Sequence, residues 1–173
     1  ALLVAKVPAS DMVAINSLQR NGFQFRDLSL KPRLDLHQVM DDYLPVGTRS
    51  ARQDDMAELM DIASQAFQVS RYHADPDVGH PKANLRYRRW VESAMDSQTQ
   101  ELVVCEVEGQ TIGFFVQELL QDHMYWHLTA IKENQQGKGY GYRTWRSLMT
   151  VAHSRGRHEI RTSISALNLP VLN

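Results

Sequence analysis

The sequence predicts an α/β protein in which helices flank a central sheet built around an antiparallel meander. Residues 101–107, 111–120 and 123–131 carry the apolar alternation of half-buried strands, and short polar turns separate them. A glycine-rich hexapeptide at residues 136–141 follows the third stretch, and a helical stripe of apolar residues begins directly after it. Strands joined by short turns pair antiparallel, so we expect a meander that leads into a glycine loop and a helix.

The first part of the chain predicts a small strand–helix–strand unit in front of this core. Residues 2–7 are apolar and end at a proline, which is typical of a strand. Ser10 or Asp11 can cap a helix, and Gly22 supplies its left-handed end. Residues 23–30 then alternate with a change of parity, which indicates a strand with a bulge.

A connector is expected at residues 31–45, because its prolines argue against a regular core element. We therefore divide the chain into an N-terminal degenerate half-domain with its connector, residues 1–45, and a main domain, residues 46–173. The elements expected around the meander are a strand at residues 46–51, helices at about residues 54–67, 82–96 and 142–154, and a last strand at residues 158–164.

Composition excludes several classes of protein. The 173 residues are 43% hydrophobic and carry a formal net charge of −1, so the chain can bury a core but offers no global charge for nucleic acid. No apolar run approaches the roughly 20 residues of a membrane helix. The single cysteine, Cys105, lies in an apolar strand and indicates a buried residue in a reducing cytoplasm. The seven histidines are scattered along the chain, so no metal site is expected.

The glycine-rich hexapeptide predicts a phosphate site, although a plain strand-to-helix turn is the alternative. Glycines free the backbone for positive φ, and the following helix would point unpaired N–H groups at an anion. A Walker A loop is excluded because glycine follows Lys138, and the dinucleotide fingerprint is excluded because Tyr142 replaces its third glycine. The residues expected to bind the phosphate are Gln136, Gly137, Lys138, Gly139, Tyr140 and Gly141.

Read as Q-x-x-G-x-G, residues 136–141 resemble the acyl-CoA pyrophosphate loop of the GCN5-related N-acetyltransferase (GNAT) superfamily. The order of expected elements over about residues 46–173 is similar to that family. The resemblance implies a mixed, mostly antiparallel sheet, with acetyl-CoA bound in a gap where the sheet splays between the fourth and fifth strands of the main domain. We also expect further C-terminal strands beyond Asn173, since Val171 and Leu172 would otherwise end a helix without a partner. The tyrosine that commonly protonates the thiolate in this family would lie on that later part.

The resemblance assigns cofactor-binding roles outside the loop. Thr129, Ala130 and Ile131 would offer backbone groups to the pantetheine arm and to the acetyl carbonyl. Asn168 matches an asparagine that contacts the cofactor at the start of the following helix.

Acetyl transfer to an amine requires a base, because an alkylammonium with a pKa near ~10 must lose a proton before it attacks. A regular strand would place Tyr125, His127, Thr129 and Ile131 on one face. In the resembled family, side chains four and six residues before the position of Ile131 act as base or hold a relay water, which implies these roles for His127 and Tyr125. An imidazole titrates near ~6.5 and suits the task. The alternatives are a structural role for His127 and a base role for Glu118.

A polar loop is predicted to bind the acceptor amine. Its sequence S-R-Y-H-A-D-P, residues 70–76, resembles a narrower group of acetyltransferases that act on amino sugars carried by nucleotides. On this resemblance, Arg71 and His73 bind an anionic small-molecule amine, since guanidinium groups suit diphosphate oxygens. Alternatively, Arg71 pairs with Asp75 or Asp77 and only braces the loop.

Together these features predict an acetyl-CoA-dependent N-acetyltransferase in which a primary amine attacks directly in a ternary complex. Two alternatives stay open: a non-catalytic acyl-CoA-binding or regulatory module on the same fold, and an enzyme of this family that acts on another small amine or a peptide N-terminus. Nucleic-acid and membrane partners are not expected, a homodimer is left open, and the expected location is the cytoplasm.

Overall fold

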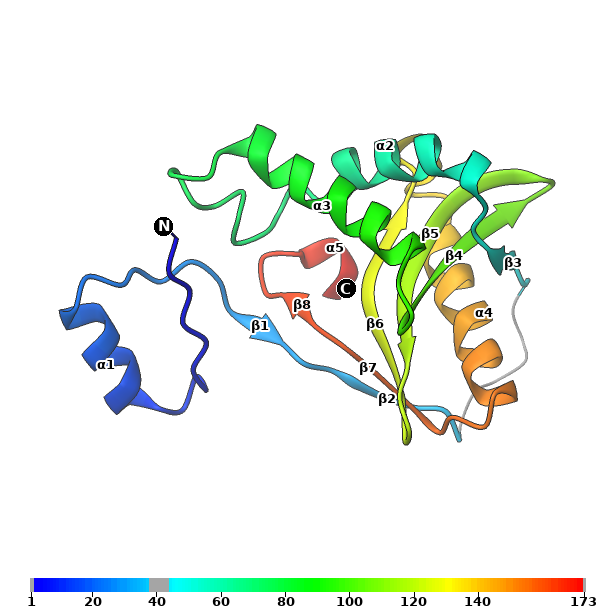
Figure 1. Ribbon diagram of the computed structural model, residues 1–173. Helices are drawn as coiled ribbons and strands as arrows, with labels where there is room; N and C mark the ends of the chain where they lie inside the picture. Colours follow the sequence, from blue (N-terminus) through cyan, green and yellow to red (C-terminus); the bar gives the residue numbers. More distant parts are fainter. Residues whose placement is uncertain (1, 38–43, 173) are drawn as a thin grey trace.

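The computed structural model describes residues 2–37 and 44–172 and contains a central six-stranded sheet (Figure 1). Its strands lie in the order β2-β7-β6-β5-β4-β3, and a separate two-stranded ladder joins β1 to β8. All neighbours in the large sheet pair antiparallel except β6 and β7, so the predicted mixed, mostly antiparallel sheet is confirmed. The strands are β1 (Ser29–Leu30), β2 (Arg33–Asp35), β3 (Gly47–Ser50), β4 (Gln100–Val107), β5 (Gln110–Leu119), β6 (Met124–Ile131), β7 (Glu159–Thr162) and β8 (Ile164–Ser165).

Helices cover both faces of the large sheet (Figure 1). One buried cluster joins α2 and α3 to the sheet through side chains such as Leu59, Val91 and Phe114. A second cluster joins α4 to the opposite face through Leu148 and Trp126. The helices are α1 (Met12–Arg20), α2 (Met56–Ala66), α3 (His80–Met95), α4 (Tyr140–Ser154) and α5 (Leu169–Leu172), with 3-10 turns η1 (Gln53–Asp55) and η2 (Glu133–Gln135).

The predicted meander is confirmed as β4, β5 and β6. Val104 of β4 pairs with Phe114 of β5, which pairs in turn with Ala130 of β6. At Gly113 the two later strands approach closely, because a Cβ atom there would lie 2.2 Å from the Ala130 carbonyl oxygen. Only glycine leaves room for this approach, so Gly113 fixes the last part of β6 against its neighbour.

A β-bulge in β6 changes which of its side chains share a face. Val116 of β5 pairs with Leu128, whereas the next residue, Gln117, pairs with Trp126, so His127 is the extra residue. Leu128 packs in the cluster of α2 and α3, and Trp126, two positions earlier, packs in the cluster of α4. In a regular strand these two side chains would point the same way.

The bulge contradicts the prediction of one common face for Tyr125, His127, Thr129 and Ile131. His127 lies on the side of α2 and α3, where its ring is 6.1 Å from that of Trp90 between centroids. Thr129 pairs with Phe115, a member of the α4 cluster, and therefore lies on the other side of the sheet. Side chains alternate between the two faces both before and after the extra residue, but residues that would have shared a face across it now lie on opposite faces.

The pairing of β6 with β7 stops before the bulge. Met124, Tyr125 and Trp126 have partners on β7, and Thr162 Oγ1 donates a hydrogen bond of 2.9 Å to the Trp126 carbonyl at the last pair. The chain then forms β8, which pairs with β1 instead of β6. The splay between the fourth and fifth strands of the main domain is thus present. Within residues 2–37 and 44–172, no strand pairs with the far edge of β6 after Trp126.

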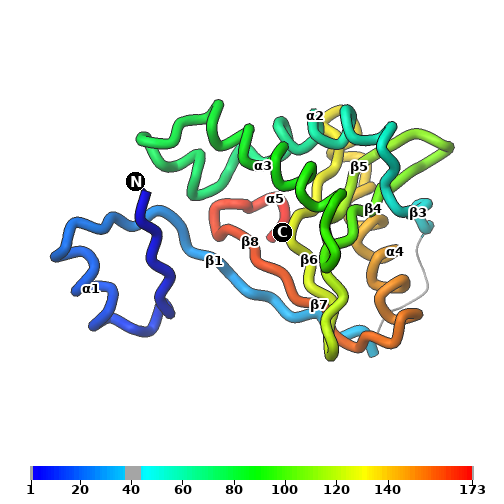
Figure 2. Tube along the Cα trace, in the orientation of Figure 1, coloured from blue at the N-terminus to red at the C-terminus, as the bar shows by residue number. Residues whose placement is uncertain are grey.

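The N-terminal part differs most from its prediction. Residues 2–7 are exposed coil rather than a strand, and only Ser29–Leu30 of the strand expected at residues 23–30 is paired. The predicted helix is confirmed as α1, in which Asp11 accepts a hydrogen bond of 2.9 Å from the Ala14 N–H. Figure 2 shows α1 to one side of the sheet, and none of its residues is buried. An apolar stretch becomes a strand only where a partner strand lies beside it.

Two boundaries predicted nearer the core are also wrong. The expected connector contains β2, which pairs with β7 at the edge of the sheet directly after Pro32. A proline at the start of an edge strand leaves the ladder intact. Residues 38–43 of that connector lie outside the described residues. The single last strand expected at residues 158–164 is divided at Ser163 into β7 and β8.

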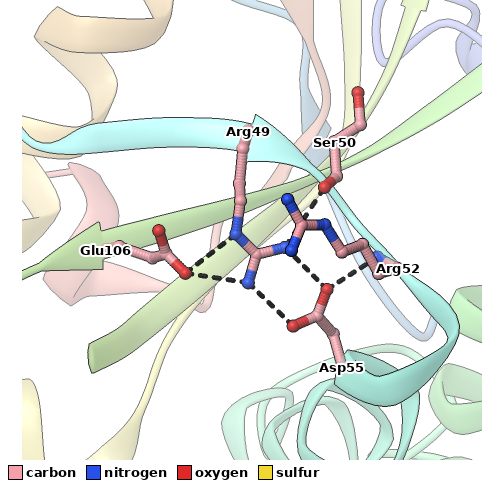
Figure 3. A network of polar contacts seen from close by, with 5 residues as sticks. All are labelled: Arg49, Ser50, Arg52, Asp55 and Glu106. Atoms are coloured by element: carbon pink, nitrogen blue, oxygen red, sulfur yellow. Dashed lines mark hydrogen bonds and ion pairs between the residues drawn. The ribbon is translucent and has the colours of Figure 1, made fainter. Parts of the chain in front are cut away.

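A group of charged side chains, which we call the Arg49 cluster (Arg49, Asp55 and Glu106), joins β3, β4 and the start of α2 (Figure 3). Arg49 donates to both oxygens of Asp55, over 2.7 and 2.8 Å, and to Glu106 over 2.9 Å. The Arg52 backbone N–H donates to Asp55 over 2.6 Å. The hydrogen bonds from Arg49 outweigh the effect of burial and lower the pKa of Asp55 to about 2.

Candidate active site

The glycine loop joins β6 to α4 through η2, as predicted. Gly137 and Gly139 have φ of 74° and 79°, in the left-handed region that favours glycine. A Cβ atom at Gly137, Gly139 or Gly141 would meet no described atom within 4 Å, so open space lies above the loop. The Gln136 side chain donates to the Ile131 carbonyl over 3.0 Å and ties the start of the loop to the end of β6.

The N-terminus of α4 lies directly behind this loop. The helix begins at Tyr140, and Gly139 as its N-cap offers no capping side chain. The first N–H groups of any helix lack partners inside that helix, and together with the dipole they favour an anion. Lys138 donates to Gln135 over 3.1 Å and adds a cation at the same end. The loop therefore has the space, the donors and the charge for a phosphate group.

The open edge of β6 leads to this loop. Thr129, Ala130 and Ile131 lie after the bulge, on the part of the strand that β7 leaves. Strand backbone that lacks a neighbour presents unpaired N–H and C=O groups, which an extended ligand can pair with. The three residues that the resemblance named thus lie on the part of β6 that β7 does not pair with, and the Ile131 carbonyl there accepts from Gln136.

The bulge places His127 in a small polar group. Its Nε2 lies 2.9 Å from Glu118 Oε2, and its ring centroid is 4.8 Å from that of Tyr125. A carboxylate accepts hydrogen bonds and donates none, so Nε2 carries the hydrogen, and in the neutral imidazole Nδ1 then holds the lone pair. No described residue bonds to Nδ1. The sequence named Glu118 only as another base and did not indicate this contact.

Burial raises the pKa of the Tyr125 hydroxyl. A phenol with a raised pKa stays protonated at neutral pH, so Tyr125 can donate a hydrogen bond or hold a water but does not serve as the base. Burial also raises the pKa of the Cys105 thiol to about 12. The prediction that Cys105 is a buried residue is confirmed, and a thiol in this state is a poor nucleophile.

The two residues predicted to bind the acceptor contact other residues of the loop before α3 and, for His73, the helix α3 itself. His73 contacts Ser70 through Nδ1 and Asn84 through Nε2, both over 2.8 Å. Arg71 donates from Nη2 to the Tyr72 hydroxyl over 2.8 Å, and its buried Nε has no hydrogen-bond partner among the described residues.

The alternative ion pair between Arg71 and Asp75 or Asp77 is not formed. Asp75 instead accepts from Arg26 of the N-terminal part over 3.3 Å. Asn168 directly precedes α5, at the helix start that the resemblance predicted. Among residues 2–37 and 44–172, no group of three or more His, Cys, Asp or Glu side chains could hold a metal ion. No helix in those ranges is long and apolar enough to cross a membrane.

The model of the acetyltransferase (GNAT) family matches residues 56–173, which is more than half of the chain. The chain belongs to this family. It is 26% identical over 171 residues to the dTDP-fucosamine acetyltransferase of Escherichia coli O6:H1 (strain CFT073), and the match covers 97% of this chain and 71% of that protein.

Solved structures of GNAT proteins share the fold. A GCN5-related N-acetyltransferase from Sphaerobacter thermophilus superposes with a TM-score of 0.63 at 15% identity, over 91% of this chain and 49% of that one. The PaiA N-acetyltransferase from Thermoplasma acidophilum, solved in complex with coenzyme A, gives a TM-score of 0.50 at 13% identity, over 72% of this chain and 82% of that one. At these identities the likeness shows the GNAT fold alone, and the predicted fold class is confirmed.

Proposed function

We propose that this GNAT protein transfers the acetyl group of acetyl-CoA to a primary amine. One observation carries the proposal: the unpaired edge of β6 runs from the His127 bulge to a glycine loop at the N-terminus of α4. The loop fits a pyrophosphate because a ligand would meet open space and N–H donors there. Acetyl-CoA supplies an acetyl group that is activated as a thioester.

Residues of three kinds would hold acetyl-CoA. The loop residues Gln136–Gly141 would bind its pyrophosphate, and the backbone of Thr129–Ile131 would pair with the pantetheine arm. Asn168, at the start of α5, would contact the cofactor from the far side of the splay. These roles follow the family resemblance, and the open edge and the uncapped helix support them.

His127 is the base in this proposal. Its Nδ1 takes a proton from the ammonium group of the acceptor, while Glu118 accepts from Nε2 and holds the ring in that tautomer. The amine then forms the C–N bond as the C–S bond breaks, and its second proton neutralises the departing CoA thiolate. Tyr125, which remains a phenol, positions the amine or a relay water beside His127.

The proposed acceptor is a small amine, and among small amines we favour an amino sugar on a nucleotide carrier. The support for this choice is the 26% identity to a dTDP-fucosamine acetyltransferase together with the cations of α3 and the loop before it. We assign the transfer to residues 46–173 and regard residues 1–45 as an N-terminal half-domain, of which β1 and β2 pair with strands of the main domain. His73 is engaged at both ring nitrogens, so it would shape the acceptor side rather than bind directly.

A thiol-release assay tests the function. The protein is mixed with acetyl-CoA and a panel of amines: nucleotide-linked amino sugars, free amino sugars, polyamines and a peptide with a free N-terminus. Free CoA and N-acetylated product should appear together, in equal amounts, with at least one amine. Acetyl-CoA binding without release for any amine would favour a non-catalytic acyl-CoA-binding module. Release with the peptide alone would overturn the choice of a small acceptor.

A further inference from the structure

A groove of about 570 Å³ runs along α3. Neither the glycine loop nor Arg71 and His73 line it. A volume of this size is typical of small-molecule sites. The residues that line it are Lys82, Leu85, Arg86, Arg89, Trp90 and Ser93.

The groove gathers three cations without a carboxylate. Lys82, Arg86 and Arg89 form no ion pair with any residue of the described ranges, although the chain as a whole carries a net charge of −1. Like charges that converge on one groove repel one another unless an anion lies between them. An anionic ligand is therefore the occupant that this groove favours.

Aromatic rings hold the central cation in place. The Arg86 guanidinium lies over the Tyr72 ring, 4.3 Å from its centroid, and 5.5 Å from the centroid of Trp90. Stacking fixes the plane of a guanidinium but leaves the N–H groups at its edge free to donate. Two such N–H groups match two oxygens of a phosphate or diphosphate.

Trp90 connects the groove with the proposed base. The side chain lines the groove, and its ring centroid is 6.1 Å from that of His127. Trp90 Nε1 donates to Gln100 Oε1 over 3.4 Å, which holds the ring in position. Only the Trp90 ring would lie between a ligand in the groove and the His127 ring. The partly exposed indole of Trp90 also offers a surface on which a flat ring can stack.

We propose that this groove binds a nucleoside diphosphate group of the acceptor, with the diphosphate against Arg86, Arg89 and Lys82 and the nucleobase along Trp90 and Leu85. The amine end of the same molecule then reaches His127. The assignment rests on the proposed acetyl transfer, deepens it by naming the binding residues, and places acceptor recognition on α3 rather than on Arg71 and His73.

Binding of thymidine 5′-diphosphate, measured by calorimetry in saturating CoA, tests the assignment. The CoA occupies the glycine loop, so the nucleotide cannot report on that site. Arg89→Glu should weaken binding about tenfold or more, because one favourable charge becomes a repulsive one. Arg88→Glu is the matched control: Arg88 is exposed on the same helix but does not line the groove, and we expect a change below about twofold. Equal weakening by both variants would overturn the assignment.

Two further arms separate the parts of the proposal. Inorganic pyrophosphate should bind more weakly than thymidine diphosphate, and equal affinity would contradict the contact of a nucleobase with Trp90. In turnover, Arg89→Glu should raise KM for a nucleotide-linked amino sugar and leave KM for acetyl-CoA unchanged. If acetyl transfer proceeds but Arg89→Glu changes neither binding nor KM, the groove assignment fails and the proposed function stands. If no amine releases CoA, the proposed function itself fails.

Discussion

Two groups of polar side chains in this molecule are similar in exposure and differ in which of their polar atoms have no hydrogen-bond partner. In the Arg49 cluster the side chains of Arg49 and Asp55 are 28% and 14% exposed, and in the pair of His127 and Glu118 they are 19% and 23% exposed. Both oxygens of Asp55 accept hydrogen bonds from Arg49. His127 has one bonded nitrogen, and no described residue bonds to the other.

This difference indicates that the Arg49 cluster contributes to stability and that the pair of His127 and Glu118 contributes to catalysis. The charged side chains of the Arg49 cluster bond to one another and join two strands to a helix. Loss of this cluster should therefore lower the free energy of unfolding. In the pair of His127 and Glu118, Glu118 orients the ring and Nδ1 stays available to a ligand. Loss of this pair should therefore lower the rate of acetyl transfer. Variants in the two groups test whether the Arg49 cluster affects stability alone and the His127 pair affects rate alone.

The largest expected effect is the fall in kcat caused by His127→Gln. Glutamine keeps a hydrogen bond but has no basicity, so kcat at neutral pH should fall about 100-fold. The rate should recover partly as pH approaches the pKa of the amine, because solvent then removes the proton. Steady-state thiol release from pH 6 to 10 measures both. A pH profile that overlays the profile of the unaltered protein would assign proton removal to ordered water.

The next effect is on the stability of Asp55→Asn. This change removes the charge that Arg49 contacts, so the free energy of unfolding should fall by about 2 kcal/mol, with Tm lower by roughly 4–8 °C. Asp54→Asn is the matched control, since Asp54 is exposed in the same turn and should cost little. Urea unfolding measures the difference. A large loss of kcat in molecules of Asp55→Asn that remain folded would break the comparison.

The Asp55 contribution should also disappear in acid. Its pKa is lowered from 3.8 to about 2, so the charged form stabilises the folded state above about pH 4. This stabilisation, about 2 kcal/mol, is lost as pH falls through about 2. The gap in unfolding free energy between the unaltered protein and Asp55→Asn should therefore close between pH 4 and 2. A gap that persists at pH 2 would show that Arg49 does not act through this carboxylate.

A smaller effect is expected for Glu118→Gln. The amide can still contact His127 but no longer selects the tautomer with a hydrogen on Nε2, so kcat should fall about tenfold. KM for acetyl-CoA should stay unchanged, because Glu118 lies away from the loop. Glu118→Asp, which keeps the charge, should restore part of the rate. A parallel rise of KM with loss of stability would instead indicate a structural role for the pair.

Much of the site could be predicted because its signals are local. The glycines of residues 136–141 are required by the backbone of the loop itself, and the apolar stripe of α4 begins directly after them. The meander followed from alternation and from turns such as Glu108–Gly109, both of which have positive φ. Such features depend on neighbours in sequence, so a single chain reveals them.

Other features depend on neighbours in space. The bulge at His127 arises from the register between β5 and β6, and the alternation of residues 123–131 continues through it without a break. The end of the pairing at Trp126 depends on the path of β7. The groove of α3 depends on Arg86 stacking over Tyr72, a residue of the preceding loop. No sequence period encodes these contacts.

The central claim is that the glycine loop at the start of α4 binds acetyl-CoA, and two isosteric variants test it most directly. Gly139→Asp and Gly139→Asn impose the same side-chain size at a φ of 79° and differ only in charge. Calorimetric titration with acetyl-CoA should show affinity at least about tenfold weaker for Gly139→Asp than for Gly139→Asn, because the carboxylate repels the pyrophosphate. Equal affinity of the two variants, with both folded and both matching the unaltered protein, would contradict the account.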